Sequence, residues 1–140
     1  MDVLKASKDF AAFAEEEARA RNLAVTVCVI DCHGNVVLKQ RMTDAPLHSL
    51  ELSERKAYTA ALTRLRTAEL MLLVQPGQPL YTLTSAAGGR FVALGGGIPL
   101  DDNGVVVAGL AVSGGTLEED VAVAEAAFDR LRARLEAASS

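Results

Sequence analysis

Apolar residues recur near helical spacing in the first twenty residues of the chain, with charged residues on the opposite side. This pattern predicts an amphipathic helix over residues 2–21. Near the other end of the chain Thr116 stands three residues before Glu119, which is the spacing of a helix capping box. That pair predicts a last helix over residues 116–135.

The pattern changes after the first helix. Residues 23–31 are rich in β-branched side chains, and the turn sequence His33-Gly34-Asn35 separates them from a second such run at 36–41. These residues predict a β-hairpin, followed by a loop over residues 42–48 that contains a proline.

Two more helices are expected after this loop. The first covers residues 49–65, with Ser49 or a neighbour as its cap. Small residues gather on one side of it, which would allow a close approach to a sheet: Ser53, Ala57, Ala60 and Ala61. A shorter helix over 67–74 is ended by the glycine and prolines of residues 75–79.

Three consecutive glycines, Gly95, Gly96 and Gly97, are the most unusual feature of the chain and are called the glycine run below. They indicate either unusual dihedral angles or a surface that another group approaches closely, although a strand kink or bulge would also need glycine. Ile98 and Pro99 follow, so the P-loop and dinucleotide-binding signatures do not match. The run is expected to lie between strands.

Further strands are predicted within residues 80–84, 90–94 and 105–113, and Asn103-Gly104 is a strong hairpin turn before the last of them. Short turns join antiparallel neighbours. The order of elements therefore predicts an α+β fold, with a central antiparallel sheet and flanking helices. A chain of 140 residues that is 50% apolar fits one domain over residues 1–140.

Composition excludes several classes of function. The net charge is −4 without a basic stripe, and aromatic residues make up 4% of the chain, so nucleic acid is not an expected partner. No apolar run is long enough to span a membrane, and the amphipathic start does not match a secretion signal. We therefore expect a cytoplasmic protein without membrane contact.

The two cysteines, Cys28 and Cys32, stand four positions apart in the predicted strand. At the usual rise their Cα atoms lie about 13 Å apart, which is too far for a disulfide. Both are expected to be thiols. Together with His33 and His48 they match no common zinc module, so no metal site is expected.

Several blocks of sequence occur in one order and spacing that resembles the GlcG/HbpS family over roughly residues 5–130. The blocks are Val29-Ile30-Asp31 with Gly34, Arg41-Met42 with Ala45, Lys56-Ala57-Tyr58-Thr59-Ala60, the glycine run with Ile98-Pro99-Leu100, Val112-Ser113-Gly114-Gly115, and Glu119-Asp120. The resemblance implies a profilin-like or PAS-like domain that self-associates into a dimer or larger ring. It also implies a link to haem, since some members bind or degrade it, and others are the C-terminal domain of PduO-type corrinoid adenosyltransferases.

Lys56 is the most interesting ionisable residue, because its small neighbours would hold its ammonium close to the sheet. Burial there would lower its pKa, and a carboxylate would pair with it. His48 and His33 are the two histidines, and either one is a candidate haem-iron ligand. The sequence predicts that His33 is an exposed turn residue, whereas His48 lies in the loop that resembles the family's pocket rim.

Three hypotheses of function follow. In the first, the protein binds haem or another carboxylate-bearing small molecule, using the amides of the glycine run and the ligand-binding side chains of Arg41, His48, Lys56 and Arg90. In the second, it is an enzyme acting on a small carboxylic or hydroxy acid, with Lys56 or His48 as general acid or base. In the third, it is an assembly protein whose glycines allow close packing between subunits.

Overall fold

The computed structural model describes residues 1–139 of the chain. Its elements are, in chain order, α1 (Val3–Ala20), β1 (Thr26–Asp31), β2 (Val36–Arg41), α2 (His48–Thr63), α3 (Thr67–Leu73), the 3₁₀ turns η1 (Leu83–Ser85) and η2 (Ala87–Gly89), β3 (Gly97–Asp102), β4 (Val105–Ser113) and α4 (Leu117–Ala138). The capping box of Thr116 and Glu119 is present at the start of α4, as predicted.

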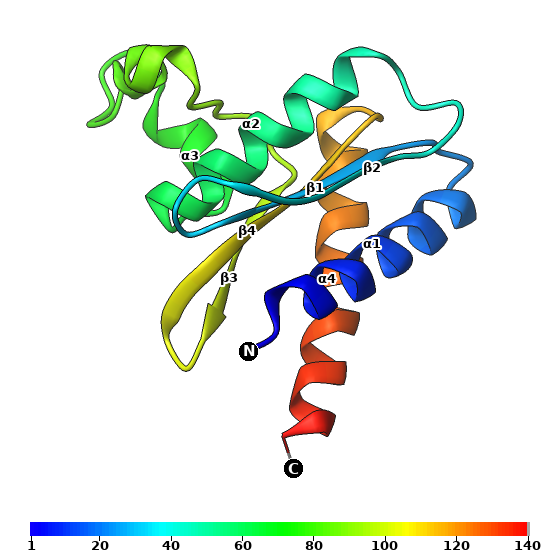
Figure 1. Ribbon diagram of the computed structural model, residues 1–140. Coiled ribbons are helices and arrows are strands. Elements are labelled where there is room, and N and C mark those ends of the chain that lie inside the picture. The colour runs from blue at the N-terminus through cyan, green and yellow to red at the C-terminus, as the bar shows by residue number, and fades with distance from the viewer. Residues whose placement is uncertain (140) are drawn as a thin grey trace.

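The strands of the described residues form one four-stranded sheet in the order β2-β1-β4-β3, and every neighbouring pair is antiparallel. Helices α1 and α4 cover one face of this sheet, and α2 lies across the other (Figure 1). The predicted α+β class and the antiparallel sheet are thus confirmed. No helix in residues 1–139 combines the length and the apolar character that a membrane crossing needs.

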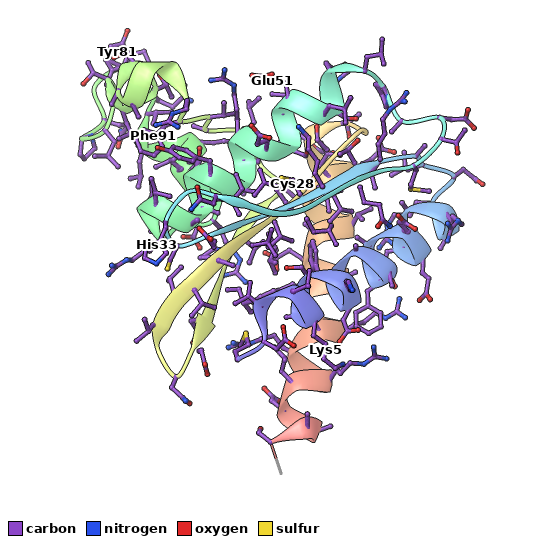
Figure 2. The ribbon with its side chains drawn as sticks, in the orientation of Figure 1. Lys5, Cys28, His33, Glu51, Tyr81 and Phe91 are labelled. Carbon is purple, nitrogen blue, oxygen red and sulfur yellow. The ribbon has the colours of Figure 1, made fainter. Side chains whose placement is uncertain are left out.

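The alternation of side chains along β1 divides the interior into two cores. Val27 and Val29 belong to the larger core with α1 and α4, whereas Cys28 and Ile30 belong to a smaller core under α2. Side chains of a strand point alternately to its two faces, so one strand supplies both cores. Figure 2 shows Cys28 between the sheet and α2.

Helix α2 lies very close to the sheet, as its small residues predict. Ser53, Ala57, Ala60 and Ala61 are all buried. Opposite them in β4 is Gly109, where an added Cβ would collide with the carbonyl oxygen of Ala57. The helix backbone therefore rests almost directly on the backbone of β4.

Two of the predicted strands are wrong. Residues 80–84 form turns and part of η1, and residues 90–94 have no strand partner. The apolar run at 91–94 is half-buried because it packs on α2, where the Val92 amide donates to Thr59 Oγ1 at 2.9 Å. An apolar run that packs against a helix can have the same sequence pattern as a buried strand.

Strand β3, which the sequence pattern did not predict, begins where the glycine run ends. Gly97 is the first residue of β3, and Pro99 lies within it. A proline in a sheet is tolerated at an edge, where its missing N–H removes no ladder bond, and β3 is an edge strand. The Asn103-Gly104 turn joins β3 to β4, as predicted.

Helix α2 begins at His48, one residue before the predicted start, and its N-cap Leu47 makes no side-chain cap. The Ser49 hydroxyl bonds instead to Thr26 Oγ1 at 2.7 Å. After α3 the chain enters a largely exposed lobe, residues 75–90, which projects beyond the sheet beside α3 (Figure 1). Figure 2 shows Tyr81 at the outer end of this lobe.

Candidate functional site

Lys56 lies in the interior, where it forms an ion pair with Asp120. Its side chain extends from α2 to the first turn of α4, and Nζ lies 2.8 Å from Asp120 Oδ2. The ammonium also donates to the Val112 carbonyl at 3.2 Å, and Asp120 Oδ1 accepts from the Gly115 amide at 2.8 Å. The pair therefore ties α2, the end of β4 and the start of α4 together.

Burial opposes the charge on both members of this pair. It lowers the pKa of Lys56 and raises the pKa of Asp120, while the attraction between the two groups acts in the opposite direction on each. Lys56 is 0% exposed. A general acid or base must reach the proton that it transfers, whereas the Lys56 ammonium is enclosed here by the protein and held by Asp120 and the Val112 carbonyl.

The glycine run packs around the same ion pair. All three glycines are buried. At Gly96, with φ of +127°, an added Cβ would stand 2.6 Å from the Val112 carbonyl oxygen and 3.1 Å from Lys56 Nζ. The Gly97 amide donates to Thr67 Oγ1 at 2.8 Å. The hollow beside the run is only about 10 Å³, roughly the room for one water molecule.

Four of the sequence blocks therefore meet at one buried cluster. Lys56, the glycine run, the Val112–Gly115 segment and Asp120 come from separate parts of the chain and contact one another here. We call this set the buried cluster. Sequence reasoning expected a carboxylate beside Lys56 but did not identify Asp120, since the two residues are 64 positions apart.

An open hollow of about 90 Å³ lies on the other side of α2, between that helix and the β1–β2 hairpin. We call it the α2 hollow. It is lined by Ile30, Gly34, Val36, Glu51, Glu54, Arg55, Tyr58 and Arg90. The Arg90 guanidinium lies over the Tyr58 ring at 4.5 Å, and the Phe91 ring lies 5.6 Å from that of Tyr58. Figure 2 shows Phe91 and Glu51 on the α2 side of the sheet.

Of the charged side chains around the α2 hollow, some have a partner of opposite charge and one does not. Glu51 is bound to Arg55 at 2.7 Å, and Glu54 to Lys39 at 3.2 Å. Arg90 donates through Nε to the Ala87 carbonyl at 3.2 Å. Within residues 1–139 no carboxylate pairs with Arg90. Its positive charge is thus the uncompensated one at this surface.

The remaining candidate residues do not line the α2 hollow. Arg41, at the end of β2, donates to the Ala45 carbonyl from Nε at 3.1 Å and from a terminal nitrogen at 2.6 Å. His48 is exposed in the first turn of α2, about 12 Å along the helix axis from Lys56. His33 is exposed in the hairpin turn, next to Gly34 of the hollow.

Both cysteines are free thiols, as predicted. Cys28 is buried under α2, and burial raises its pKa to about 12, so it remains protonated at neutral pH. Cys32 is exposed beside His33. The described part of the chain holds no group of three or more side chains of the kinds that bind metal ions.

Sequence reasoning selected Arg90 but missed the aromatic side of the α2 hollow. Tyr58 stands three positions after Arg55, so both lie on one face of α2. That spacing was a usable signal. Arg90 and Phe91 follow 32 and 33 positions after Tyr58, and no local pattern links them to it.

The fold is that of an α+β protein with a central antiparallel sheet. The chain belongs to the HbpS-like family, because the model of the family described as "Haem degrading protein HbpS-like" matches residues 4–129. The resemblance seen in the sequence blocks is thereby confirmed.

Three similar proteins place the chain within this family. It is 44% identical to an uncharacterised 15.0 kDa protein of Citrobacter freundii from the dhaT-dhaS intergenic region, over 90% of this chain and 89% of that one. It is 41% identical to the corrinoid adenosyltransferase PduO of Salmonella typhimurium over 82% of this chain, which spans only 34% of that enzyme. The crystal structure of a PduOC–haem complex superimposes with a TM-score of 0.85 at 38% identity, covering 89% of this chain and 91% of that one.

Proposed function

We propose that this protein binds a small carboxylate-bearing molecule, and that this molecule is haem. The observation that carries the proposal is the α2 hollow, where the uncompensated guanidinium of Arg90 lies over the largely buried ring of Tyr58. Haem presents an apolar ring together with anionic propionates, so its propionates match the guanidinium and its ring matches the exposed apolar side chain of Val36, which also lines the hollow. Further support comes from the PduOC–haem complex, whose fold this chain shares.

The proposal assigns the iron to one of the two exposed histidines, since a neutral imidazole is a common axial ligand of haem iron. His33 stands next to Gly34, which lines the α2 hollow, and is therefore favoured over His48. Arg41, Lys56 and the glycine run, also predicted as ligand-binding, do not line this hollow.

The proposal includes self-association into a dimer or larger ring. Pockets that enclose a ligand of drug size have volumes of roughly 300 Å³ or more, whereas the α2 hollow is about 90 Å³. Most of a porphyrin would therefore lie outside it, and a second copy of the chain would cover the remainder. Apolar side chains are available for that contact on α3 and the lobe, since Leu72 is 72% exposed and Tyr81 53% exposed.

Haemin titration tests the proposal. The purified protein is expected to give a saturable shift of the Soret band, distinct from that of free haemin in the same buffer. His33→Ala should change the position or shape of the bound band, and His48→Ala should leave it unchanged. A titration without saturation would exclude haem as the ligand, and a changed band in His48→Ala alone would reassign the iron to His48. Sedimentation with and without haemin measures the accompanying assembly.

A further inference from the structure

We infer that the α2 hollow takes one carboxylate-bearing side arm of the ligand and that Arg90 binds its carboxylate, so that affinity depends on the carboxylate more than on iron. This inference rests on the proposed function and names the group that the site recognises. It concerns the part of the ligand that enters the hollow, whereas the histidines concern the part outside it.

The size of the hollow limits what can enter. Its volume is about 90 Å³, well below the roughly 300 Å³ of pockets that enclose a ligand of drug size. A chain of a few heavy atoms fits this space, and a macrocycle does not. Among the parts of a porphyrin that bear charge, the propionate arms have the right size.

The Arg90 guanidinium is held in a fixed orientation that suits such an arm. Its Nε is used by the Ala87 carbonyl at 3.2 Å, and the face of its guanidinium rests 4.5 Å from the centre of the Tyr58 ring. These two contacts fix the plane of the group and leave its terminal nitrogens free of any partner within residues 1–139. A fixed planar guanidinium is suited to bind a carboxylate through two hydrogen bonds.

The neighbouring acids do not compete for Arg90. Glu51 and Glu54 line the hollow, but each has its own cation, in Arg55 and Lys39. Because their charges are matched, an incoming carboxylate meets a net positive surface. The binding group is preorganised, so little conformational entropy is lost when the ligand arrives.

Arg55 holds the turn that carries Arg90 in place, and it is not itself a contact of the carboxylate arm. Its terminal nitrogen donates to the Gly89 carbonyl at 2.8 Å, and its Nε lies 2.7 Å from Glu51. Gly89 precedes Arg90 in the chain, so Arg55 anchors the turn that carries the binding guanidinium. Arg55 is therefore a positioning residue.

The test compares three porphyrins: haemin, metal-free protoporphyrin IX and the dimethyl ester of protoporphyrin IX. Binding is measured by absorbance for haemin and by porphyrin fluorescence for the other two. We expect the metal-free acid to bind within about tenfold of haemin, and the ester at least tenfold more weakly than the acid. In Arg90→Ala the acid should bind as weakly as the ester does, and the ester should lose nothing more. Lys8→Ala removes an exposed positive charge from α1, on the opposite face of the sheet, and should change none of these values.

The outcomes separate this inference from the proposed function. If haemin itself does not bind saturably, the proposed function fails. If haemin binds but the acid and its ester have equal affinities, or Arg90→Ala retains the affinity of the unmodified chain, the carboxylate assignment is overturned while haem binding stands. Binding of haemin without binding of the metal-free acid would show that iron governs affinity, and would also overturn the inference.

Discussion

Arg55 and Lys56 are consecutive residues of α2, yet their side chains meet opposite environments. The Arg55 side chain is 33% exposed and lines the α2 hollow, whereas that of Lys56 is 1% exposed and belongs to the buried cluster. Neighbours on a helix point about 100° apart, so one helix separates two surfaces. The side that holds most of the sequence blocks is enclosed by the protein, and the other side opens to solvent at the α2 hollow.

The two cations should differ greatly in their contribution to stability. Removing one partner of a buried ion pair leaves an uncompensated charge and typically costs about 3–5 kcal/mol. An exposed pair such as Arg55–Glu51 contributes about 0–1 kcal/mol, because water and salt screen it. The predictions that follow test this contrast from the buried cluster outward.

Lys56→Met should have the largest effect, with a loss of about 3–5 kcal/mol in the free energy of unfolding, because Asp120 then remains buried without its cation. Urea denaturation followed by circular dichroism measures it. A second variant, Lys56→Met with Asp120→Leu, removes both charges and should recover much of the loss, although the Gly115 amide loses its acceptor. A single variant within about 1 kcal/mol of the parent would show that the pair adds little.

Gly96→Ala should cost about 2–4 kcal/mol, since it combines a positive φ with a Cβ placed 2.6 Å from the Val112 carbonyl. Gly77→Ala is the matched control. Gly77 also has a positive φ, of +86°, but nothing lies within 4 Å of its added Cβ, so only the backbone cost of about 1–2 kcal/mol remains. Equal losses in the two variants would mean that crowding around the buried cluster is absent. Sedimentation of Gly96→Ala would then address the hypothesis that these glycines pack between subunits.

The loss of stability in Lys56→Met should itself depend on pH, and this smaller effect has a direction that can be predicted. Burial raises the pKa of Asp120, and Lys56 opposes that rise, so removing the lysine moves the pKa further up. A folded pKa above the unfolded value adds stability at low pH that is lost as the pH rises through the folded pKa. The deficit of the variant should therefore shrink on acidification, by up to about 1.4 kcal/mol for each pH unit that separates the folded pKa of Asp120 in the variant from its folded pKa in the parent chain. A deficit that grows toward low pH would contradict the assignment.

The parts of this fold that were predictable from sequence depend on neighbours in the chain. The turn at Gly34 and the capping box of Thr116 with Glu119 involve residues within a few positions, and both are present. Strand β3 was missed because glycine and proline are poor strand formers, and what makes them acceptable is the edge position, which depends on the distant strand β4.

The candidate site, like the fold, was predictable only where residues close in the chain determine it. The burial of Lys56 was anticipated from the small residues around it, but its partner Asp120 lies 64 positions away. Arg90 was selected as a side chain that can bind a carboxylate, at the start of an expected strand that the structure does not contain. Its position over Tyr58 arises from the way the lobe returns to α2. Contacts of this kind depend on the folded chain, and no spacing in the sequence reports them.

Arg55→Ala should have the smallest effect on stability, within about 1 kcal/mol, because its bonds to Glu51 and the Gly89 carbonyl lie at the surface. Its effect on ligand binding should nevertheless be measurable. Without Arg55 the turn before Arg90 is no longer anchored, so the affinity for protoporphyrin IX should fall severalfold while the ester is unaffected. Denaturation and porphyrin fluorescence on the same preparation give both values. A stability loss as large as that of Lys56→Met, or an unchanged affinity for the acid, would show that the two sides of α2 do not divide stability from binding in this way.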